Sequence, residues 1–286
     1  MTPDQRGAGP RTLVVHTGGI GDLLLACPAL ARLAEDGPIE LLGRPERLAL
    51  AVAAGIAESA YPLEQVGFDS ALSSPSPALR TFLRRFERAV VWMKDDDGVI
   101  CGNLRECGVR DAAAFPGIPP ADWAEHASRY YASCLGCGAT PSFRLELAPA
   151  SPGHDVVIHP GSGGHRKNWP VEHFAAVASA LERQGRHTTW CVGPAEDGMH
   201  VPSGASVLEG RSLIDLAHEL ASARLYIGND SGITHLAAAA GCPTVAVFGP
   251  TDPRVWAPLG GPVTVVSASP WPPPEAVLAA VEGPGR

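Results

Sequence analysis

The sequence I-G-N-D-S-G-I-T-H-L-A-A-A at residues 227–239 determines the fold of the second half of the chain. The apolar run Leu225–Ile227 predicts a buried strand, a polar turn with two glycines ends it, and the alanine-rich segment predicts a helix directly afterwards. Such a unit aims several backbone N–H groups at one point, where the helix dipole adds positive charge, so it binds anions, most often phosphate. The turn residues expected around a phosphorylated small molecule are Asp230, Ser231, Thr234 and His235.

Composition limits the classes of partner. The chain has 286 residues, of which 45% are apolar and 18% charged, as is ordinary for a soluble α/β protein. Its net charge of −8 makes it a poor electrostatic partner for nucleic acid or anionic lipid. Local basic patches remain candidates at His165–Lys167 and among the arginines of 80–88.

The sequence predicts a cytoplasmic protein. No apolar run approaches the ~18–20 residues that span a bilayer. The segment from Arg11 to Cys27 resembles an export signal, but His16, three glycines and Asp22 interrupt its apolar part. Peripheral contact with the inner face of the membrane stays open.

Strands and helices alternate along both halves of the chain. Strands are expected at 13–15, 39–42, 89–93, 156–159, 188–192, 225–227, 244–248 and 263–266. Helices are expected at 22–33, 46–54, 78–86, 123–135, 171–183, 213–221, 232–240 and 274–281. This alternation predicts an α/β fold of parallel sheets with helices on both faces.

A Gly- and Pro-rich segment at 136–153 separates the halves. We therefore predict a flexible tail at 1–12, domains at 13–145 and 146–270, and a C-terminal tail or helix at 271–286. In doubly wound folds ligands lie beyond the carboxyl ends of the strands, so the loops that follow strands are expected to converge on a cleft between the domains.

The first loop, His16–Asp22, only partly matches a dinucleotide fingerprint. Its glycines do not follow G-x-G-x-x-G, and the next strand ends at Gly43-Arg44 without the acid expected on a ribose hydroxyl. Asp22 opens the following helix. It is either a helix-capping acid or a general base that faces the cleft.

The second loop, Pro160–Pro170, is rich in small residues that let a backbone approach a phosphate closely. Lys167 supplies a cation, and Pro170 stands near the start of the next helix. The alternative is a surface loop whose charges are solvated.

Metal and redox motifs are weak. Asp95–Asp97 resembles a D-x-D metal motif, but an acidic turn after a strand explains it as well. Cys134 and Cys137 form a lone C-x-x-C, and Cys101 and Cys107 have the wrong spacing to complete a zinc site. His159 and His235 are too distant in sequence to be claimed as ligands, so no metal is expected.

Three segments resemble glycosyltransferase family 9, the ADP-heptose heptosyltransferases of bacterial surface polysaccharide synthesis. Gly19–Asp22 with Cys27–Leu30 is similar to "S-L-G-D…L-P-A-L", and His159–Pro170 is similar to "H-P-G-A…K-x-W-P". Gly228–Ala239 with the F-G-P-T-D-P run at 248–253 is similar to "G-x-D-T-G-x-x-H-L-A-A-A…F-G-P-T-D-P". The resemblance covers both halves of the chain.

The resemblance implies a GT-B fold of two Rossmann-like domains and inverting, metal-independent glycosyl transfer without a cofactor. Asp22 would take the proton from an acceptor hydroxyl, and Lys167 would stabilise the departing diphosphate of a nucleotide sugar, ADP-heptose in the family. The other donor-binding residues would be Ser162, Gly163, Glu196, Asp230, Ser231, Gly232, Thr234 and His235. Gly18 and Gly19 would lie on the acceptor side.

The acceptor is left open: a glycan, a lipid-linked sugar, a protein or a small molecule. No nucleic-acid partner is expected. Two other functions remain as alternatives: a nicotinamide-dependent Rossmann oxidoreductase and a non-catalytic nucleotide-binding protein.

Overall fold

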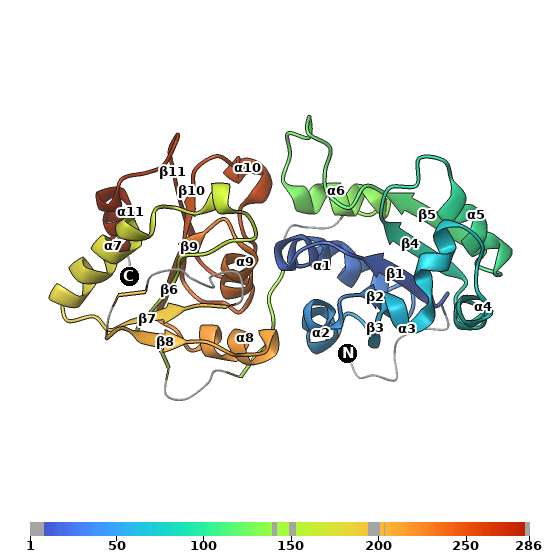
Figure 1. The fold of residues 1–286 in the computed structure, drawn as a ribbon, viewed down its shortest axis with the longest axis horizontal. Coiled ribbons are helices and arrows are strands. Elements are labelled where there is room, and N and C mark those ends of the chain that lie inside the picture. The colour runs from blue at the N-terminus through green and yellow to red at the C-terminus, as the bar shows by residue number, and fades with distance from the viewer. Residues whose placement is uncertain (1–8, 139–141, 149–152, 194–200, 203, 284–286) are drawn as a thin grey trace. The chain divides into compact units, whose positions relative to one another are not determined.

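A computed structural model describes residues 9–138, 142–148, 153–193, 201–202 and 204–283. The contacts divide the chain into two compact units (Figure 1). The first unit comprises 1–18, 26–123 and 127–141, and the second comprises 19–25, 124–126 and 142–286.

The first unit is built on a parallel sheet in the order β3-β2-β1-β4-β5. Its strands are β1 (Thr12–His16), β2 (Ile39–Gly43), β3 (Ser59–Pro62), β4 (Arg88–Trp92) and β5 (Asp111–Phe115). The chain therefore runs outward from β1 to one edge and returns to continue on the other side. That reversal between β1 and β4 is the point at which doubly wound sheets bind ligands.

Helices connect the strands of this sheet, and one more helix, α6, follows its last strand. They are α1 (Ile20–Ala34), α2 (Pro45–Ala53), α3 (Leu63–Val66), η2 (Phe68–Leu72), α4 (Pro77–Leu83), α5 (Val99–Glu106) and α6 (Ala127–Cys134). Local residues determine where two of these helices begin. Proline occupies the first turn of α2 and of α4. The hydroxyl of Ser76 also caps α4 by accepting from the N–H of Leu79. Apolar side chains of α3, α4 and α5 pack on β1, β2 and β4 to form one core.

The second unit repeats the plan with a parallel sheet in the order β11-β10-β9-β6-β7-β8. Its strands are β6 (Val156–His159), β7 (Thr188–Cys191), β8 (Ser206–Leu208), β9 (Leu225–Asn229), β10 (Thr244–Phe248) and β11 (Val263–Ser267). Here the chain reverses between the neighbouring strands β6 and β9. The loops after these two strands therefore emerge side by side at one edge of the sheet.

The helices of the second unit are η3 (His165–Lys167), α7 (Val171–Arg183), α8 (Leu213–Ala221), α9 (Gly232–Ala239), α10 (Pro253–Trp256) and α11 (Pro274–Val281). Trp169 and Phe174 pack on the central strands together with Val277 and Val281 of α11. The C-terminal helix is therefore part of the core of this unit.

The structure adds three strands that the sequence did not indicate. They are β3, β5 and β8, and each lies at the edge of its sheet with mostly half-exposed or exposed residues. The helix expected at 123–135 is shorter and spans Ala127–Cys134. Glycines at the C-cap end helices where the backbone must turn left-handed, as at Gly67 after α3.

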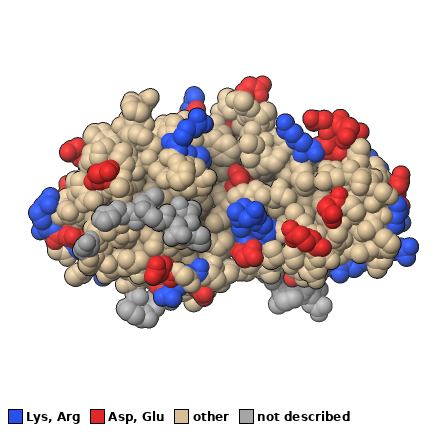
Figure 2. Space-filling model, viewed as in Figure 1, with Lys and Arg blue, Asp and Glu red and all other residues tan. Residues whose placement is uncertain are grey.

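In the part of the chain that the structure describes, no helix combines the length and the apolar character that a membrane span needs. On the face shown in Figure 2, cationic and anionic side chains are interspersed among uncharged ones. Within each unit, the described residues on this face form no continuous basic stripe of the kind that tracks a nucleic-acid backbone.

His16 ends β1 beside Trp92, which ends β4 in register with it, and the two rings meet edge to face at 5.7 Å. The His16 side chain is buried, and its Nε2 has no hydrogen-bond partner among the described residues. Burial lowers the pKa of His16 to about 4, with a smaller contribution from the charge of Arg47.

This burial predicts acid sensitivity. Between an ordinary pKa of 6.5 and about 4, the unfolded chain binds a proton at His16 that the folded protein excludes, so the free energy of unfolding falls as the pH falls through that window. Replacing His16 with Phe should reduce the loss of unfolding free energy between pH 7 and pH 4 by about 3 kcal/mol, measured by urea unfolding at each pH. The exposed His187→Asn should leave that loss unchanged. An equal loss in His16→Phe and the unsubstituted protein would contradict the assignment.

Candidate functional site

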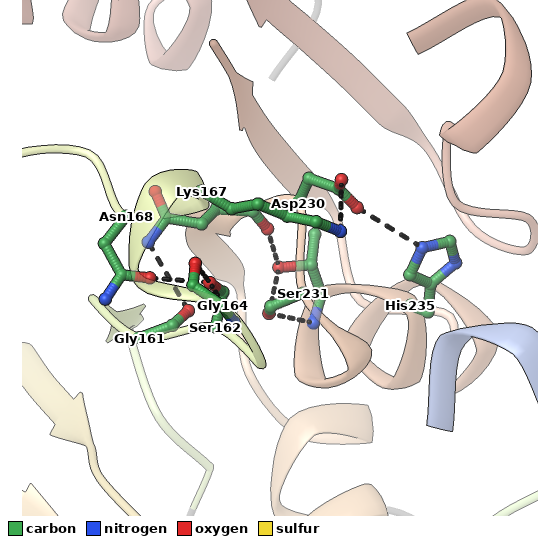
Figure 3. A network of polar contacts seen from close by, with 10 residues as sticks. Gly161, Ser162, Gly164, Lys167, Asn168, Asp230, Ser231 and His235 are labelled. Carbon is green, nitrogen blue, oxygen red and sulfur yellow. Dashed lines mark hydrogen bonds and ion pairs between the residues drawn. The ribbon is translucent and has the colours of Figure 1, made fainter. Parts of the chain in front are cut away.

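Two loops of the second unit meet where β6 and β9 end, and they bring most of the predicted donor residues together (Figure 3). Pro160–Lys167 follows β6, and Asp230 and Ser231 follow β9. The Nζ of Lys167 donates to Oδ2 of Asp230 at 2.9 Å. The carboxylate of Asp230 is nearly buried, whereas the Lys167 side chain is 41% exposed, so the cation is the partner that solvent or a ligand can reach.

Asn229 connects the two loops from within. Its side chain is fully buried, its Nδ2 donates to the carbonyl of Pro160 at 2.7 Å, and its Oδ1 accepts from the N–H of Trp169 at 2.9 Å. Both ends of the loop after β6 are therefore tied to the last residue of β9. Asn229 lies within the motif at 227–239, but its residue type alone did not predict this role. Its signal was an amide side chain at the end of an otherwise apolar strand.

The hydroxyl of Ser162 holds the loop after β6 in shape. Oγ of Ser162 lies 2.6 Å from Oδ1 of Asn168 and 2.8 Å from the carbonyl of Gly164, and it accepts from the N–H of Gly164 at 3.2 Å. Ser162 thus shapes the turn from inside. A Cβ placed on Gly163 would meet no atom within 4 Å, so the space beside that backbone is open.

The turn after β9 begins helix α9. Ser231 is its N-cap, and its Oγ accepts from the N–H of Thr234 at 3.3 Å. Thr234 is fully buried, and its hydroxyl donates to the carbonyl of Asn229. The hydroxyl oxygen of Tyr226 lies 3.1 Å from Oγ1 of Thr234. Because a helix leaves its first N–H groups without partners in the helix, those of Gly232 and Ile233 point out of the first turn. The result is a positive helix end beside Lys167.

His235 adds a neutral ring to this site. It is buried, with Nε2 at 3.9 Å from Oδ1 of Asp230, and its Nδ1 has no hydrogen-bond partner among the described residues. Burial lowers the pKa of His235 to about 4, although the nearby Asp230 opposes that shift. At neutral pH the ring therefore contributes no charge.

The remaining predicted residues are Asp22, Gly18, Gly19 and Glu196. Asp22 lies near His235, because its charge acts on that ring and a Cβ on the neighbouring Gly21 would lie 2.9 Å from Cδ2 of His235. Asp22 is in the first turn of α1, where its Oδ2 accepts from the N–H of Gly19 at 2.7 Å, and the carbonyl of Gly18 accepts from Arg47 at 2.8 Å. Glu196 lies outside the described residues. The capping role weighed for Asp22 is therefore present, because a third-residue acid that reaches back to the N-cap N–H is half of a capping box.

The weaker motifs have structural explanations. The carboxylate of Asp95 accepts from the N–H groups of Ile100 and Cys101 and thereby caps α5. Among the described residues, neither Cys134 nor Cys137 takes part in a disulfide. The thiol of Cys137 donates to the carbonyl of Ala132 at 3.5 Å, and burial raises the pKa of Cys134. Within the described ranges, no group of three or more His, Cys, Asp or Glu side chains is placed to hold a metal ion.

The sequence profile of glycosyltransferase family 9 (heptosyltransferase) matches residues 137–283, which is more than half of the chain. The chain belongs to glycosyltransferase family 9. The matched residues include all the described side chains of the site between β6 and β9, so the family assignment and the geometry concern the same part of the molecule.

Known members of glycosyltransferase family 9 resemble the chain in sequence and in fold. Lipopolysaccharide heptosyltransferase 1 of Pseudomonas aeruginosa is 36% identical over 118 residues, which cover 38% of this chain and 33% of that protein. The match thus spans about a third of the curated relative's length.

Solved structures match nearly the whole chain. The glycosyl transferase family 9 protein of Veillonella parvula has a TM-score of 0.76 at 18% identity and covers 96% of each chain. The Escherichia coli heptosyltransferase WaaC with ADP has a TM-score of 0.69 at 20% identity, covering 95% of this chain and 99% of that one. The two Rossmann-like units accordingly form a GT-B fold.

The buried amide of Asn229 makes the site dependent on one side chain. Asn229→Ala would leave the N–H of Trp169 and the carbonyl of Pro160 buried without partners, at a cost of about 1–3 kcal/mol for each. We expect a fall of at least about 2 kcal/mol in the free energy of unfolding, measured by urea denaturation. Asn168→Ala, at the half-buried neighbour in the same loop, should cost less. Equal stabilities of the two variants would contradict this role of Asn229.

Proposed function

We propose that this member of glycosyltransferase family 9 transfers a sugar from a nucleoside diphosphate donor to an acceptor hydroxyl, with inversion and without a metal ion. The donor we infer is ADP-heptose, and the base is Asp22. The observation that carries the proposal is the placement of Lys167 beside Asp230 at the N-terminus of α9, where two neighbouring parallel strands end.

The donor half of the proposal follows from charge. A diphosphate needs cationic and N–H donors, and the site offers the half-exposed ammonium of Lys167 and the first turn of α9. The open space at Gly163 leaves room for the phosphates against the loop backbone. These groups can stabilise the negative charge that develops on the leaving diphosphate, which a metal ion does in other transferases. Relatives named heptosyltransferases and the ADP complex of WaaC support the choice of donor.

The other donor residues have supporting roles. Ser162 shapes the loop after β6, and Ser231 and Thr234 build the turn after β9. The neutral ring of His235 and the carboxylate of Asp230 would face the sugar or its phosphates. Glu196 would contact the ribose of the nucleotide, and Gly18 and Gly19 would lie on the acceptor side.

The chemical step uses the carboxylate of Asp22. Oδ2 is held by the N–H of Gly19, which leaves Oδ1 to accept the proton of the acceptor hydroxyl. The hydroxyl oxygen then forms a bond to the anomeric carbon of the donor as the bond from that carbon to the diphosphate oxygen breaks. The products are an inverted glycoside, a nucleoside diphosphate and a protonated Asp22.

Calorimetry tests the donor site without an acceptor. ADP-heptose should bind in the presence of EDTA, and NAD, UDP and GDP should bind more weakly. Lys167→Met should weaken ADP-heptose binding about 10- to 100-fold, because a charge-assisted contact to phosphate is lost and Asp230 is left unpaired. Arg183→Met removes an equal charge from the far end of α7 and should bind normally. Binding of NAD alone would instead favour an oxidoreductase. Loss of ADP-heptose binding in EDTA would show that a metal ion takes part.

Substitution of the base tests the chemical step. Asp22→Asn should lower turnover by about 10²- to 10⁴-fold, while the dissociation constant for ADP-heptose stays within about twofold, because only proton removal is lost. The assay follows ADP release on addition of heptose-deficient lipopolysaccharide or another acceptor. Asp96→Asn, an exposed acid in the loop after β4, provides the matched control. Near-normal turnover of Asp22→Asn would remove this residue from its role.

A further inference from the structure

One peptide group in the loop before α1 is held at both ends by charged side chains. Its carbonyl, from Gly18, accepts a hydrogen bond from Nη1 of Arg47 at 2.8 Å. Its N–H, from Gly19, donates to Oδ2 of Asp22 at 2.7 Å. A cation and an anion are thus joined through a single planar, conjugated group.

The two bonds strengthen each other. Electron density drawn toward the carbonyl oxygen by the guanidinium makes the N–H of the same peptide a better donor, and the carboxylate on that N–H makes the carbonyl a better acceptor. Both bonds have a charged partner and the short length typical of such bonds. The charge of Arg47 therefore reaches Asp22 through the peptide group.

The placement of Arg47 follows from the local chain path. Arg47 lies in the first turn of α2, which begins at Pro45 immediately after β2. A Cβ at Gly43 would collide with the carbonyl oxygen of His16, so the ends of β1 and β2 approach as closely as glycine permits. This approach brings the half-buried Arg47 to the loop that follows β1, and its charge also lowers the pKa of the buried His16.

Gly19 fits the same arrangement. A Cβ on Gly19 would lie 3.2 Å from Oδ2 of Asp22, closer than ordinary van der Waals contact. A side chain at this position would therefore push on the carboxylate that the N–H of Gly19 holds. The position of Oδ2 of Asp22 therefore depends on the small size of Gly19 and on the peptide group that Arg47 holds from the other side.

We propose that Arg47 is a positioning residue that fixes the carboxylate of Asp22 through the peptide between Gly18 and Gly19. The structural part of this proposal stands by itself, and its effect on turnover rests on the proposed function of Asp22. With Oδ2 locked, Oδ1 keeps one orientation toward the acceptor hydroxyl. Without Arg47 the peptide plane can rotate, and the carboxylate loses that orientation.

The first test observes the peptide directly by NMR, in the full-length protein without substrate. Arg47→Met should move the Gly19 amide proton upfield and increase its exchange rate with solvent about tenfold or more, because the bond to Asp22 weakens. Asp22→Asn should shift the same proton in the same direction. Arg44→Met removes an exposed charge three residues earlier and should leave the Gly19 signal unchanged. An unchanged Gly19 amide in Arg47→Met would overturn the proposal.

The second test measures the consequence for turnover, as ADP release from ADP-heptose with heptose-deficient lipopolysaccharide. Arg47→Met should lower kcat at least about tenfold at an unchanged dissociation constant for ADP-heptose, because a misplaced base slows the step without touching the donor. Arg47→Lys should restore most of kcat, since it keeps a cationic donor. Arg47→Gln, which keeps a neutral donor, should fall between the two and replaces Arg47→Met if that variant does not fold.

The outcomes separate the two proposals. A shifted Gly19 amide together with normal turnover in both Arg47→Met and Asp22→Asn would retain the link through the peptide and reject Asp22 as the base. A slow Asp22→Asn together with normal kcat in Arg47→Met would retain the base and overturn the positioning role of Arg47.

Discussion

The site between the ends of β6 and β9 depends on the buried side-chain amide of Asn229. Where β6 and β9 end, the pairing between the two strands ends too. The segments that follow them have backbone N–H and C=O groups that need hydrogen-bond partners from outside the sheet. Asn229 supplies both a donor and an acceptor at that point, to the carbonyl of Pro160 and the N–H of Trp169. The loop that carries Lys167 is therefore fixed relative to the helix end at Ser231. Lys167 meets Asp230 because this amide sets the distance between the two loops.

The two sheets share one topological feature. Each sheet reverses its direction of growth beside its first strand, and in each the polar residues gather in the loops after the strands at that reversal. In the second unit the loops present a cation and a helix N-terminus, which suit a diphosphate. After β1 of the first unit, the chain enters residues 19–25, which group with the second unit, and presents the carboxylate of Asp22, which accepts from the N–H of Gly19. The proposed anion binding and the proposed proton removal would thus both use loops that follow strands at such a reversal.

The sequence predicted the central parts of the fold because burial and periodicity coincide there. Strands such as β1, β9 and β10 are buried at every position and appear as uninterrupted apolar runs. Edge strands have one neighbour and an exposed side, so β3 and β5 lack that pattern, and β5 is mostly alanine. The motif glycines indicated which loops matter. They could not indicate that Arg47, on another helix, reaches Gly18, because that contact depends on the spacing of β1 and β2.

The ion pair between Lys167 and Asp230 would also make the proposed donor site selective among anions. Because the ammonium already rests on a nearly buried carboxylate, an entering anion must exchange one charged contact for another. Inorganic phosphate would contact the ammonium of Lys167 but would leave the carboxylate of Asp230 without its partner, so its net binding free energy would be small. A nucleoside diphosphate would bring a second phosphate and a base, whose contacts would offset the exchange. Under the proposed function, the ion pair with Asp230 would therefore disfavour free phosphate at this place.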